Sequence, residues 1–144
     1  MTIRPRAVRA LRDVRERLRD AAAASHATAA ATRDARQLAL VDEQRRLEEH
    51  VDEAVNVLGA ARTVYDLDRY AETTGVYRIA ITDAATRRDE ATAVTQLTAG
   101  KLRESTRQLR SAEKLVELVE TGRSRREASN EQRANDDIAA RRAR

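Results

Sequence analysis

The chain has 144 residues and a formal net charge of +4, with 36% charged residues, 2% aromatic residues and no Phe, Trp or Cys. This composition cannot fill the core of a layered globule, and it excludes disulfides and thiolate metal sites. No long apolar run is present, so the sequence predicts that the chain has no signal peptide and no transmembrane helix. We therefore expect an all-α, cytoplasmic protein whose apolar residues form narrow stripes on solvated helices.

The charge is segregated along the chain. Residues 1–19 carry seven Arg against Asp13 and Glu16, a net charge of +5. Residues 123–144 carry seven Arg against four acidic residues, a net charge of +3, which leaves −4 for residues 20–122. Both ends are thus basic, and basic clusters of this kind are typical of contacts with acidic partners.

The first expected element is a helix over about 4–58, opened by Pro5. Its apolar stripe is expected to have a shift of frame near Leu38, which is a stutter or stammer of the coiled coil. Before the shift the stripe contains Ala7, Leu11, Val14, Leu18, Ala21, Ser25, Thr28 and Thr32, and after it Leu40, Gln44, Leu47, Val51, Ala54 and Leu58.

A turn is expected at 59–63. Gly59 follows the last apolar residue of the first helix, and Thr63 with Asp66 three residues later forms a capping box in which Asp replaces the usual Glu or Gln. The alternative turn, 73–75, has more obvious turn residues, but an apolar frame continues through it.

The second expected helix covers 64–141. Apolar residues recur at steps of three and four from Leu67 to Val119, which is a heptad seam. Its members are Leu67, Tyr70, Thr74, Tyr77, Ile81, Ala84, Ala91, Thr95, Thr98, Leu102, Ser105, Leu109, Ala112, Val116 and Val119, with Arg88 as an outlier. We predict a single domain over 1–144: two long helices forming an antiparallel coiled-coil hairpin with a C-terminal helical overhang. Paired residue numbers should add to about 122, which places Ile3 opposite Val119.

The sequence contains no constellation for catalysis. His26 and His50 are the only histidines, and neither has another His or a Cys nearby in sequence. Although Glu49 and Glu53 stand beside His50, an exposed helix face explains His50 better than a metal site does. Adjacent carboxylates point in different directions around a helix, so they cannot act as a paired acid and base. We expect no enzyme activity, no cofactor and no metal.

All three aromatic residues, Tyr65, Tyr70 and Tyr77, fall near the expected tip of the hairpin. Aromatic side chains are frequent anchors of protein interfaces, so they are candidates for a docking patch. Because Tyr70 and Tyr77 occupy seam positions, Tyr65 is the better candidate for contact with a partner.

Two segments carry a resemblance to a known family. The run Ser-Ala-Glu-Lys-Leu-Val-Glu-Leu at 111–118 and the run Glu-Gln-Arg-Ala-Asn-Asp-Asp-Ile-Ala-Ala-Arg-Arg at 131–142 resemble the carboxy-terminal half of the FliJ family. These are stalk proteins and chaperones of flagellar type III protein export, related to injectisome stalk proteins. The sequence departs from the family pattern at Leu118, where Arg is usual, and at Asp137, where Glu is usual.

The resemblance implies that the joined chain ends insert into the ring of the export ATPase hexamer and that the tip engages the membrane protein of the export gate. Tyr65, Tyr70 and Tyr77 would then face the gate, and export chaperones are further implied partners. The resemblance also implies a role in flagellum biogenesis, and so in chemotaxis, with peripheral attachment at the inner face of the cell membrane. The residues implied at the ATPase ring are Arg4, Arg6, Arg9, Arg12, Arg123, Arg126 and Arg133.

Two other functions fit the same residues. One is a generic coiled-coil adaptor that dimerises into a four-helix bundle, which would sediment as a compact dimer rather than an extended monomer. The other is an Arg-rich nucleic-acid-binding protein, whose affinity should fall steeply with salt. Interleaved acidic residues and the lack of aromatics near the arginines disfavour nucleic acid as the partner.

Overall fold

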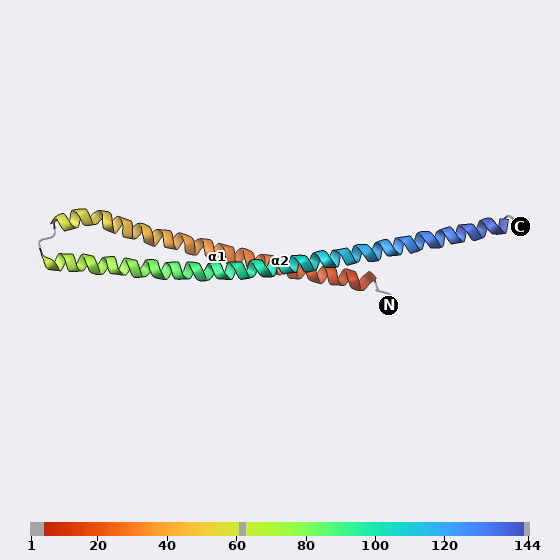
Figure 1. The fold of residues 1–144 in the computed structure, drawn as a ribbon, viewed down its shortest axis with the longest axis horizontal. Helices are drawn as coiled ribbons and strands as arrows, with labels where there is room; N and C mark the ends of the chain where they lie inside the picture. Colours follow the sequence, from red (N-terminus) through yellow and green to blue (C-terminus); the bar gives the residue numbers. More distant parts are fainter. Residues whose placement is uncertain (1–4, 61–62, 143–144) are drawn as a thin grey trace. The chain divides into compact units, whose positions relative to one another are not determined.

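The computed structural model describes residues 5–60 and 63–142, although not the side chains of residues 55, 57, 58, 140 and 142. Helix α1 covers Pro5–Ala60 and helix α2 covers Val64–Arg142 (Figure 1). Every residue in the described ranges except Thr63 is helical. The two long helices pack against each other as a helical hairpin, as predicted. Across the described residues, neither helix has a stretch apolar enough to cross a membrane.

The turn lies between Ala60 and Val64, inside the segment 59–63, whereas the alternative turn at 73–75 is continuous helix. Thr63 and Asp66 cap the start of α2. The Asp66 backbone N–H donates to Thr63 Oγ1 at 3.3 Å, and the Thr63 backbone N–H donates to Asp66 Oδ2 at 3.1 Å. This reciprocal pair is a capping box, and the shorter Asp side chain completes it as Glu would.

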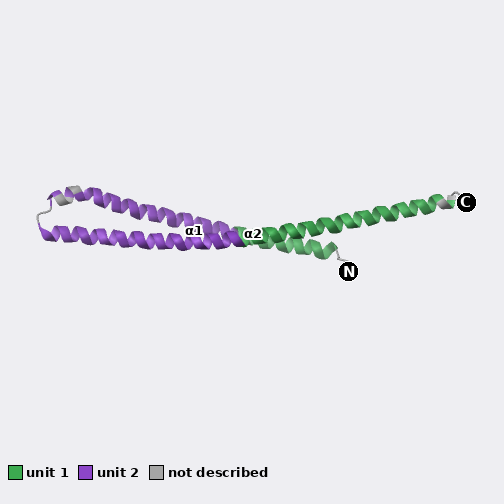
Figure 2. Cartoon of the chain, viewed as in Figure 1, with its two compact units in different colours: residues 1–23, 101–144 green, residues 24–100 purple. Residues whose placement is uncertain are grey.

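The structure divides into two compact units (Figure 2). The tip unit comprises residues 24–100, and the terminal unit comprises residues 1–23 together with 101–144. Each unit contains one segment of α1 and one of α2, and each is described separately below.

In the tip unit, contacts between side chains of the two helices fix an antiparallel register. His26 lies against Thr98, Ala29 against Thr95, and His50 against Thr74, and the two numbers in every pair add to 124. The predicted sum was about 122, so the prediction differs from the structure by only two residues.

The predicted seam of α2 is confirmed from Tyr70 to Val119. Every position of that frame is buried or half-buried, including Arg88, and the most enclosed are Thr95, Leu109 and Ala112. Leu67, the first residue of the predicted frame, is instead exposed. Thr95 is a buried polar residue whose hydroxyl lies within hydrogen-bond distance of the backbone oxygens of Ala91 and Ala29, so it is satisfied inside the seam.

The predicted seam of α1 is wrong in its first half. Ala7, Leu11, Val14, Leu18 and the other members before the shift are exposed, and the side chains one position later face α2. No stutter is present, because one uninterrupted frame of alternating four- and three-residue steps runs from Val8 to Ala54. Its buried and half-buried members are Val8, Arg12, Arg15, Arg19, Ala22, His26, Ala29, Arg33, Leu40, Glu43, Leu47, His50 and Ala54, and Arg36 alone in the frame is exposed.

The prediction for α1 fails because four of these buried or half-buried seam positions hold arginine. An arginine can lay its aliphatic stem along the groove while its guanidinium reaches water, so it fills a seam position that sequence patterning reads as polar. After Leu38 the prediction is partly correct, since Leu40, Leu47 and Ala54 are seam residues, but Glu43 and His50 take the places assigned to Gln44 and Val51. The side chain of Leu58 lies outside the described residues.

In the terminal unit, α2 continues beyond the start of α1 (Figure 2). Arg9, near the start of α1, pairs with Glu120 of α2, and residues 123–139 are exposed throughout. The predicted overhang is therefore present, and Ile138 is half exposed on it. The predicted neighbour of Val119, Ile3, lies outside the described residues.

Candidate partner-binding surfaces

The described residues contain no group of three or more His, Cys, Asp or Glu side chains placed to hold a metal ion. The functional candidates are instead surfaces for other molecules. Three such surfaces are present: the aromatic end of the tip unit, and the arginines and exposed aliphatic residues of the terminal unit.

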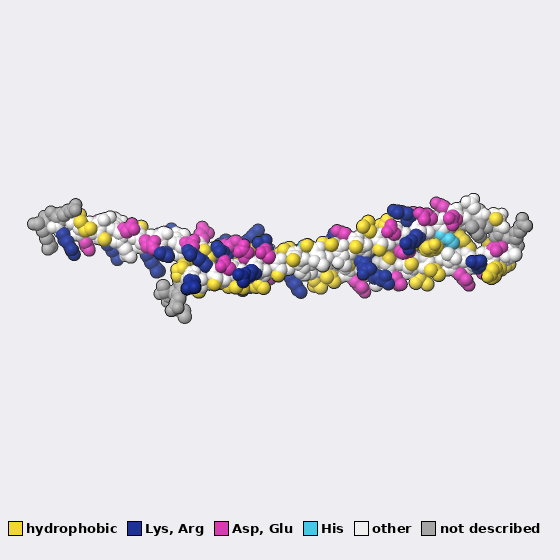
Figure 3. All heavy atoms as spheres, turned by 180° about the vertical axis from the view of Figure 1, so that it is seen from behind, with side chains coloured by type: hydrophobic (Ala, Val, Ile, Leu, Met, Phe, Trp, Pro, Cys, Tyr) yellow, Lys and Arg dark blue, Asp and Glu magenta, His cyan; other side chains and the backbone are white. Residues whose placement is uncertain are grey.

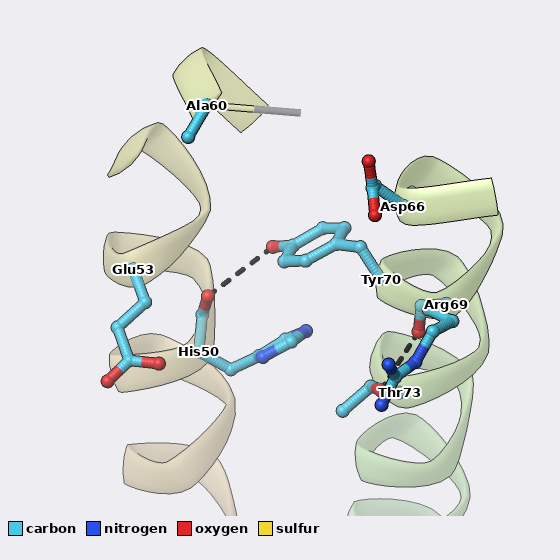
Figure 4. Close-up of a pocket in the computed structure, with 7 residues that line it drawn as sticks. All are labelled: His50, Glu53, Ala60, Asp66, Arg69, Tyr70 and Thr73. Atoms are coloured by element: carbon cyan, nitrogen blue, oxygen red, sulfur yellow. Dashed lines mark hydrogen bonds between the residues drawn. The ribbon is translucent and has the colours of Figure 1, made fainter. Parts of the chain in front are cut away.

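At the tip, Tyr70 and Tyr77 pack on His50. The rings of His50 and Tyr70 stack with centroids 4.4 Å apart and an interplanar angle of 15°, and the Tyr77 ring lies 5.2 Å from His50 at 45°. The Tyr70 hydroxyl donates to the backbone oxygen of His50 at 3.5 Å (Figure 4). Both tyrosines are half-buried, so they hold the two helices together and offer little surface to a partner.

Each of the two histidines forms a hydrogen bond to a threonine of the other helix. Thr74 uses its only hydroxyl proton on the backbone oxygen of Tyr70 at 2.9 Å, so its oxygen must accept the bond from His50 Nε2 at 3.2 Å. His26 Nδ1 likewise donates to Thr98 Oγ1 at 3.2 Å, since Thr98 donates to backbone oxygens of its own helix. Both residues are half-buried in the seam, so the predicted exposed helix face is wrong for His50.

A shallow groove opens beside this stack in the tip unit. Its lining combines the His50 and Tyr70 rings with charged and polar side chains from both helices (Figure 4). Glu53 stands on α1, and Arg69 and Thr73 on α2. The groove has both signs of charge and no enclosed cavity, so it is suited to a polar side chain of a docked protein rather than to a cofactor.

Tyr65 is exposed at the start of α2. Its exposed fraction is 69%, and the neighbouring Val64 and Leu67 are exposed as well. Of the three predicted tip residues, Tyr65 is the one whose ring faces solvent. Together Val64, Tyr65 and Leu67 form an apolar group beside the turn, and we call it the tip patch.

The arginines predicted at the ring end differ in what they bind within the chain. Arg9 pairs with Glu120 at 2.8 Å, Arg12 with Asp13 at 2.7 Å and Arg123 with Glu127 at 2.6 Å. The hydrogen bond to Asp13 and its charge raise the pKa of Arg12, and those of Glu127 raise the pKa of Arg123. Both shifts favour the charged form of Arg12 and Arg123.

Three other arginines of that set are free to meet a partner. Arg6, Arg126 and Arg133 are exposed and form no ion pair within the described part of the chain. Arg4 lies outside the described residues.

Sequence reasoning missed the third surface. Leu11, Val14 and Leu18 of α1, which were assigned to the seam, and Leu115 and Leu118 of α2 are between 40% and 68% exposed in the terminal unit. We call these five residues the aliphatic flank. Its signal in the sequence was the second apolar frame on α1, which runs one position ahead of the true seam.

Comparison with known proteins gives one finding. A family model described as the flagellar FliJ protein matches residues 6–144, essentially the whole chain. No curated protein and no solved structure matches the chain significantly.

Proposed function

The chain belongs to the FliJ family of flagellar proteins, which has a role in flagellar protein export, and we propose that it is the stalk of a type III export apparatus. In this proposal the whole chain acts as one non-enzymatic hairpin and export chaperone. The terminal unit inserts into the ring of the export ATPase hexamer, and the tip unit contacts the export gate. The protein would act in the cytoplasm at the inner face of the membrane, and swimming and chemotaxis would depend on it.

The observation that carries the proposal is the overhang of α2 in the terminal unit. Among the described residues, no other helix packs against 123–139, and Arg126 and Arg133 stand exposed on this segment. A single polar helix of this length would be marginally stable in water, so a surrounding protein would stabilise it. Free guanidiniums favour a partner that presents carboxylates.

The arginine set divides accordingly. Arg6, Arg126 and Arg133 would form intermolecular ion pairs, because their guanidiniums have no partner in the described chain. Arg9, Arg12 and Arg123 would contribute less, since each already neutralises a carboxylate of its own chain.

At the other unit, Tyr65 would contact the gate as part of the tip patch. Exposed aromatic and aliphatic groups supply the buried area of an interface, whereas Tyr70 and Tyr77 would support this surface from within.

The test of ring contact is stimulation of ATP hydrolysis and ring assembly by the purified chain, using its cognate export ATPase. The double variant Arg126→Glu with Arg133→Glu should lose most of the stimulation. A matched control, Arg78→Glu with Arg87→Glu, reverses two exposed arginines of the tip unit and should stimulate normally. Equal loss in both variants, or no stimulation by the native chain, contradicts the proposal.

The test of gate contact uses Tyr65→Ala and the cytoplasmic domain of the gate protein. This variant should bind the gate domain more weakly but still stimulate the ATPase, because the two contacts lie in different units. Ile79→Ala, which truncates another exposed apolar residue of the tip unit, is the control and should bind as the native chain does.

A further inference from the structure

The aliphatic flank lies on one side of the seam of the terminal unit. Leu11 and Leu115, from different helices, line the same groove together with Ser111 and Ala112. The Arg9–Glu120 ion pair marks the other side, because both residues occupy the opposite heptad flank. Figure 3 shows hydrophobic side chains gathered along α1 next to its N-terminal end. Aliphatic residues grouped on one side of so small a unit are typical of an interaction site.

The groove between the two helices has the form that a third helix needs. It measures about 270 Å³ and is bordered by leucines from both helices. Three of its polar side chains are already bonded to one another, since Arg15 donates to Gln108 Oε1 and Gln108 donates to Glu104 Oε1 at 2.9 Å. Arg107 also lines the groove and its guanidinium has no partner among the described residues, so a helix that covers the groove needs a carboxylate to pair with it.

Charge distinguishes the two sides of the terminal unit, as heptad positions place the side chains. The side with the aliphatic flank carries four cations against Glu104, a net charge of +3. The cations are Arg17, Lys101, Arg107 and Lys114. Arg17, Arg107 and Lys114 stand at the outward-facing heptad position, which borders both sides alike. Counted in the same way, the opposite side carries seven cations against six carboxylates, a net charge of +1, so the flank side is the more basic of the two. The charged residues that belong to the opposite side alone are Arg6, Arg9, Arg103 and Arg110, with Asp13, Glu16, Asp20, Glu113, Glu117 and Glu120.

We propose that the aliphatic flank is a docking groove for an amphipathic helix of another protein, one that carries an aliphatic stripe bordered by acidic residues. Its stripe packs on Leu11, Leu18 and Leu115, and its carboxylates pair with the surrounding cations. Such a helix completes a three-helix coiled coil, the mode in which a helix lies in an apolar groove. The inference goes beyond the stalk role and does not require insertion into an ATPase ring.

Charge disfavours a second copy of this chain as the occupant. Two aliphatic flanks face to face would bring two basic borders together, which is repulsive. The opposite side of a second copy offers Glu113, Glu120 and other charged residues but no large aliphatic stripe. A lipid surface is also disfavoured, because Glu104 and Gln108 would enter its apolar region and the flank has no aromatic residue for the interface.

The experiment measures binding of labelled peptides to the full chain by fluorescence anisotropy. One designed helical peptide has leucine at a and d and glutamate at e and g, so that repulsion keeps it monomeric. A second has lysine at e and g. The glutamate peptide should bind at least about tenfold more tightly than the lysine peptide. Reversing the border with Arg17→Glu and Lys114→Glu should invert this preference.

The variant Leu18→Gln with Leu115→Gln should weaken binding of the glutamate peptide by about tenfold or more. Val76→Gln with Ile79→Gln replaces two aliphatic residues of the tip unit, each 65% exposed, and should leave binding unchanged. Circular dichroism should report the same helicity for both variants.

Three results would overturn the inference. They are equal affinity for the two peptides, binding of neither peptide, and an equal loss of binding in the variant Leu18→Gln with Leu115→Gln and in the control Val76→Gln with Ile79→Gln. Sedimentation of the native chain as a dimer that Leu18→Gln with Leu115→Gln dissociates would overturn it as well, since the flank would then be a self-association surface. Tighter binding to phosphatidylcholine–phosphatidylglycerol vesicles than to the glutamate peptide, lost in the same variant, would assign the flank to a membrane instead. The assay contains no ATPase, so its failure is separate from failure of the stalk proposal.

Discussion

Leu38 and Leu40 of α1 test the position of the α1 seam directly, because they are the same residue type, two positions apart, in the same unit. Leu40 is a seam residue with 6% of its surface exposed, whereas Leu38 is 66% exposed. Truncation to alanine removes the same three carbon atoms at both positions and changes helix propensity equally. The difference between Leu40→Ala and Leu38→Ala therefore reports burial alone.

The expected magnitude follows from the exposed fractions. Three buried carbons contribute about 2.4 kcal/mol at about 0.8 kcal/mol each. Scaled by burial, Leu40→Ala should lower the free energy of unfolding by about 2.3 kcal/mol, and any residual cavity adds to this. Leu38→Ala should lower it by only about 0.8 kcal/mol.

The assay is urea unfolding followed by circular dichroism at the helical minimum, with the native chain and both variants at one protein concentration. The free energy of unfolding should fall with urea concentration at the same slope in all three proteins, so the change in stability appears only as a shift of the unfolding midpoint. Equal destabilisation by the two variants would refute the α1 seam described above. A larger effect of Leu38→Ala would place the seam on a different face of α1.

Three further predictions concern single interactions. Thr63→Ala removes the capping box with Asp66 and should destabilise the start of α2 by about 1 kcal/mol, measured as faster amide hydrogen exchange there. A double-mutant cycle of Arg9→Ala and Glu120→Ala should give a coupling energy below about 1 kcal/mol that falls as salt is added, because both side chains are half exposed; a larger, salt-independent coupling would contradict this. Leu109→Ala should destabilise the chain by about 2 kcal/mol in urea unfolding and Leu118→Ala by about 1 kcal/mol or less, since Leu109 is 8% and Leu118 is 68% exposed.

The sequence was sufficient to predict the hairpin, the position of the turn and the seam of α2. In α2 the seam residues are mostly aliphatic, tyrosine, alanine or threonine, so apolar periodicity and burial coincide from Tyr70 to Val119. The capping box was readable because Thr63 and Asp66 follow a local rule of spacing that tertiary packing does not alter. The antiparallel register then followed from the turn, to within two residues.

The seam of α1 could not be predicted in the same way. In α1 the apolar residues are not the ones that the hairpin buries, because Arg12, Arg15 and Arg19 lie in the seam while Leu11 and Leu18 lie beside it. Apolar periodicity predicts that leucine is buried and arginine is exposed. No single frame contains both Leu11 and Leu40, so the prediction required a shift of frame near Leu38. The contacts across the hairpin decide the matter, since they specify one continuous frame.

The free arginines could be identified only from the structure, for a related reason. Sequence segregates the charge but does not say which guanidinium already has a partner. Arg9 pairs with Glu120 across the hairpin, 111 positions away, whereas Arg126 and Arg133 stand on the overhang of α2 and form no ion pair within the described part of the chain. Pairing of this kind depends on register, which a count of charges cannot supply.

The arginines in the α1 seam and the leucines exposed beside it have one physical consequence for function. Arginine stems in the seam bury less apolar surface than leucines would, so the terminal unit gains less stability from its own packing. The leucines that could have filled the seam are exposed beside it instead, where a second protein can bury them. A hairpin built in this way is stabilised further when a partner binds, because ligand binding to the folded state shifts the unfolding equilibrium. For a FliJ-family chain, that arrangement would make the terminal unit most stable when it is assembled into the export apparatus.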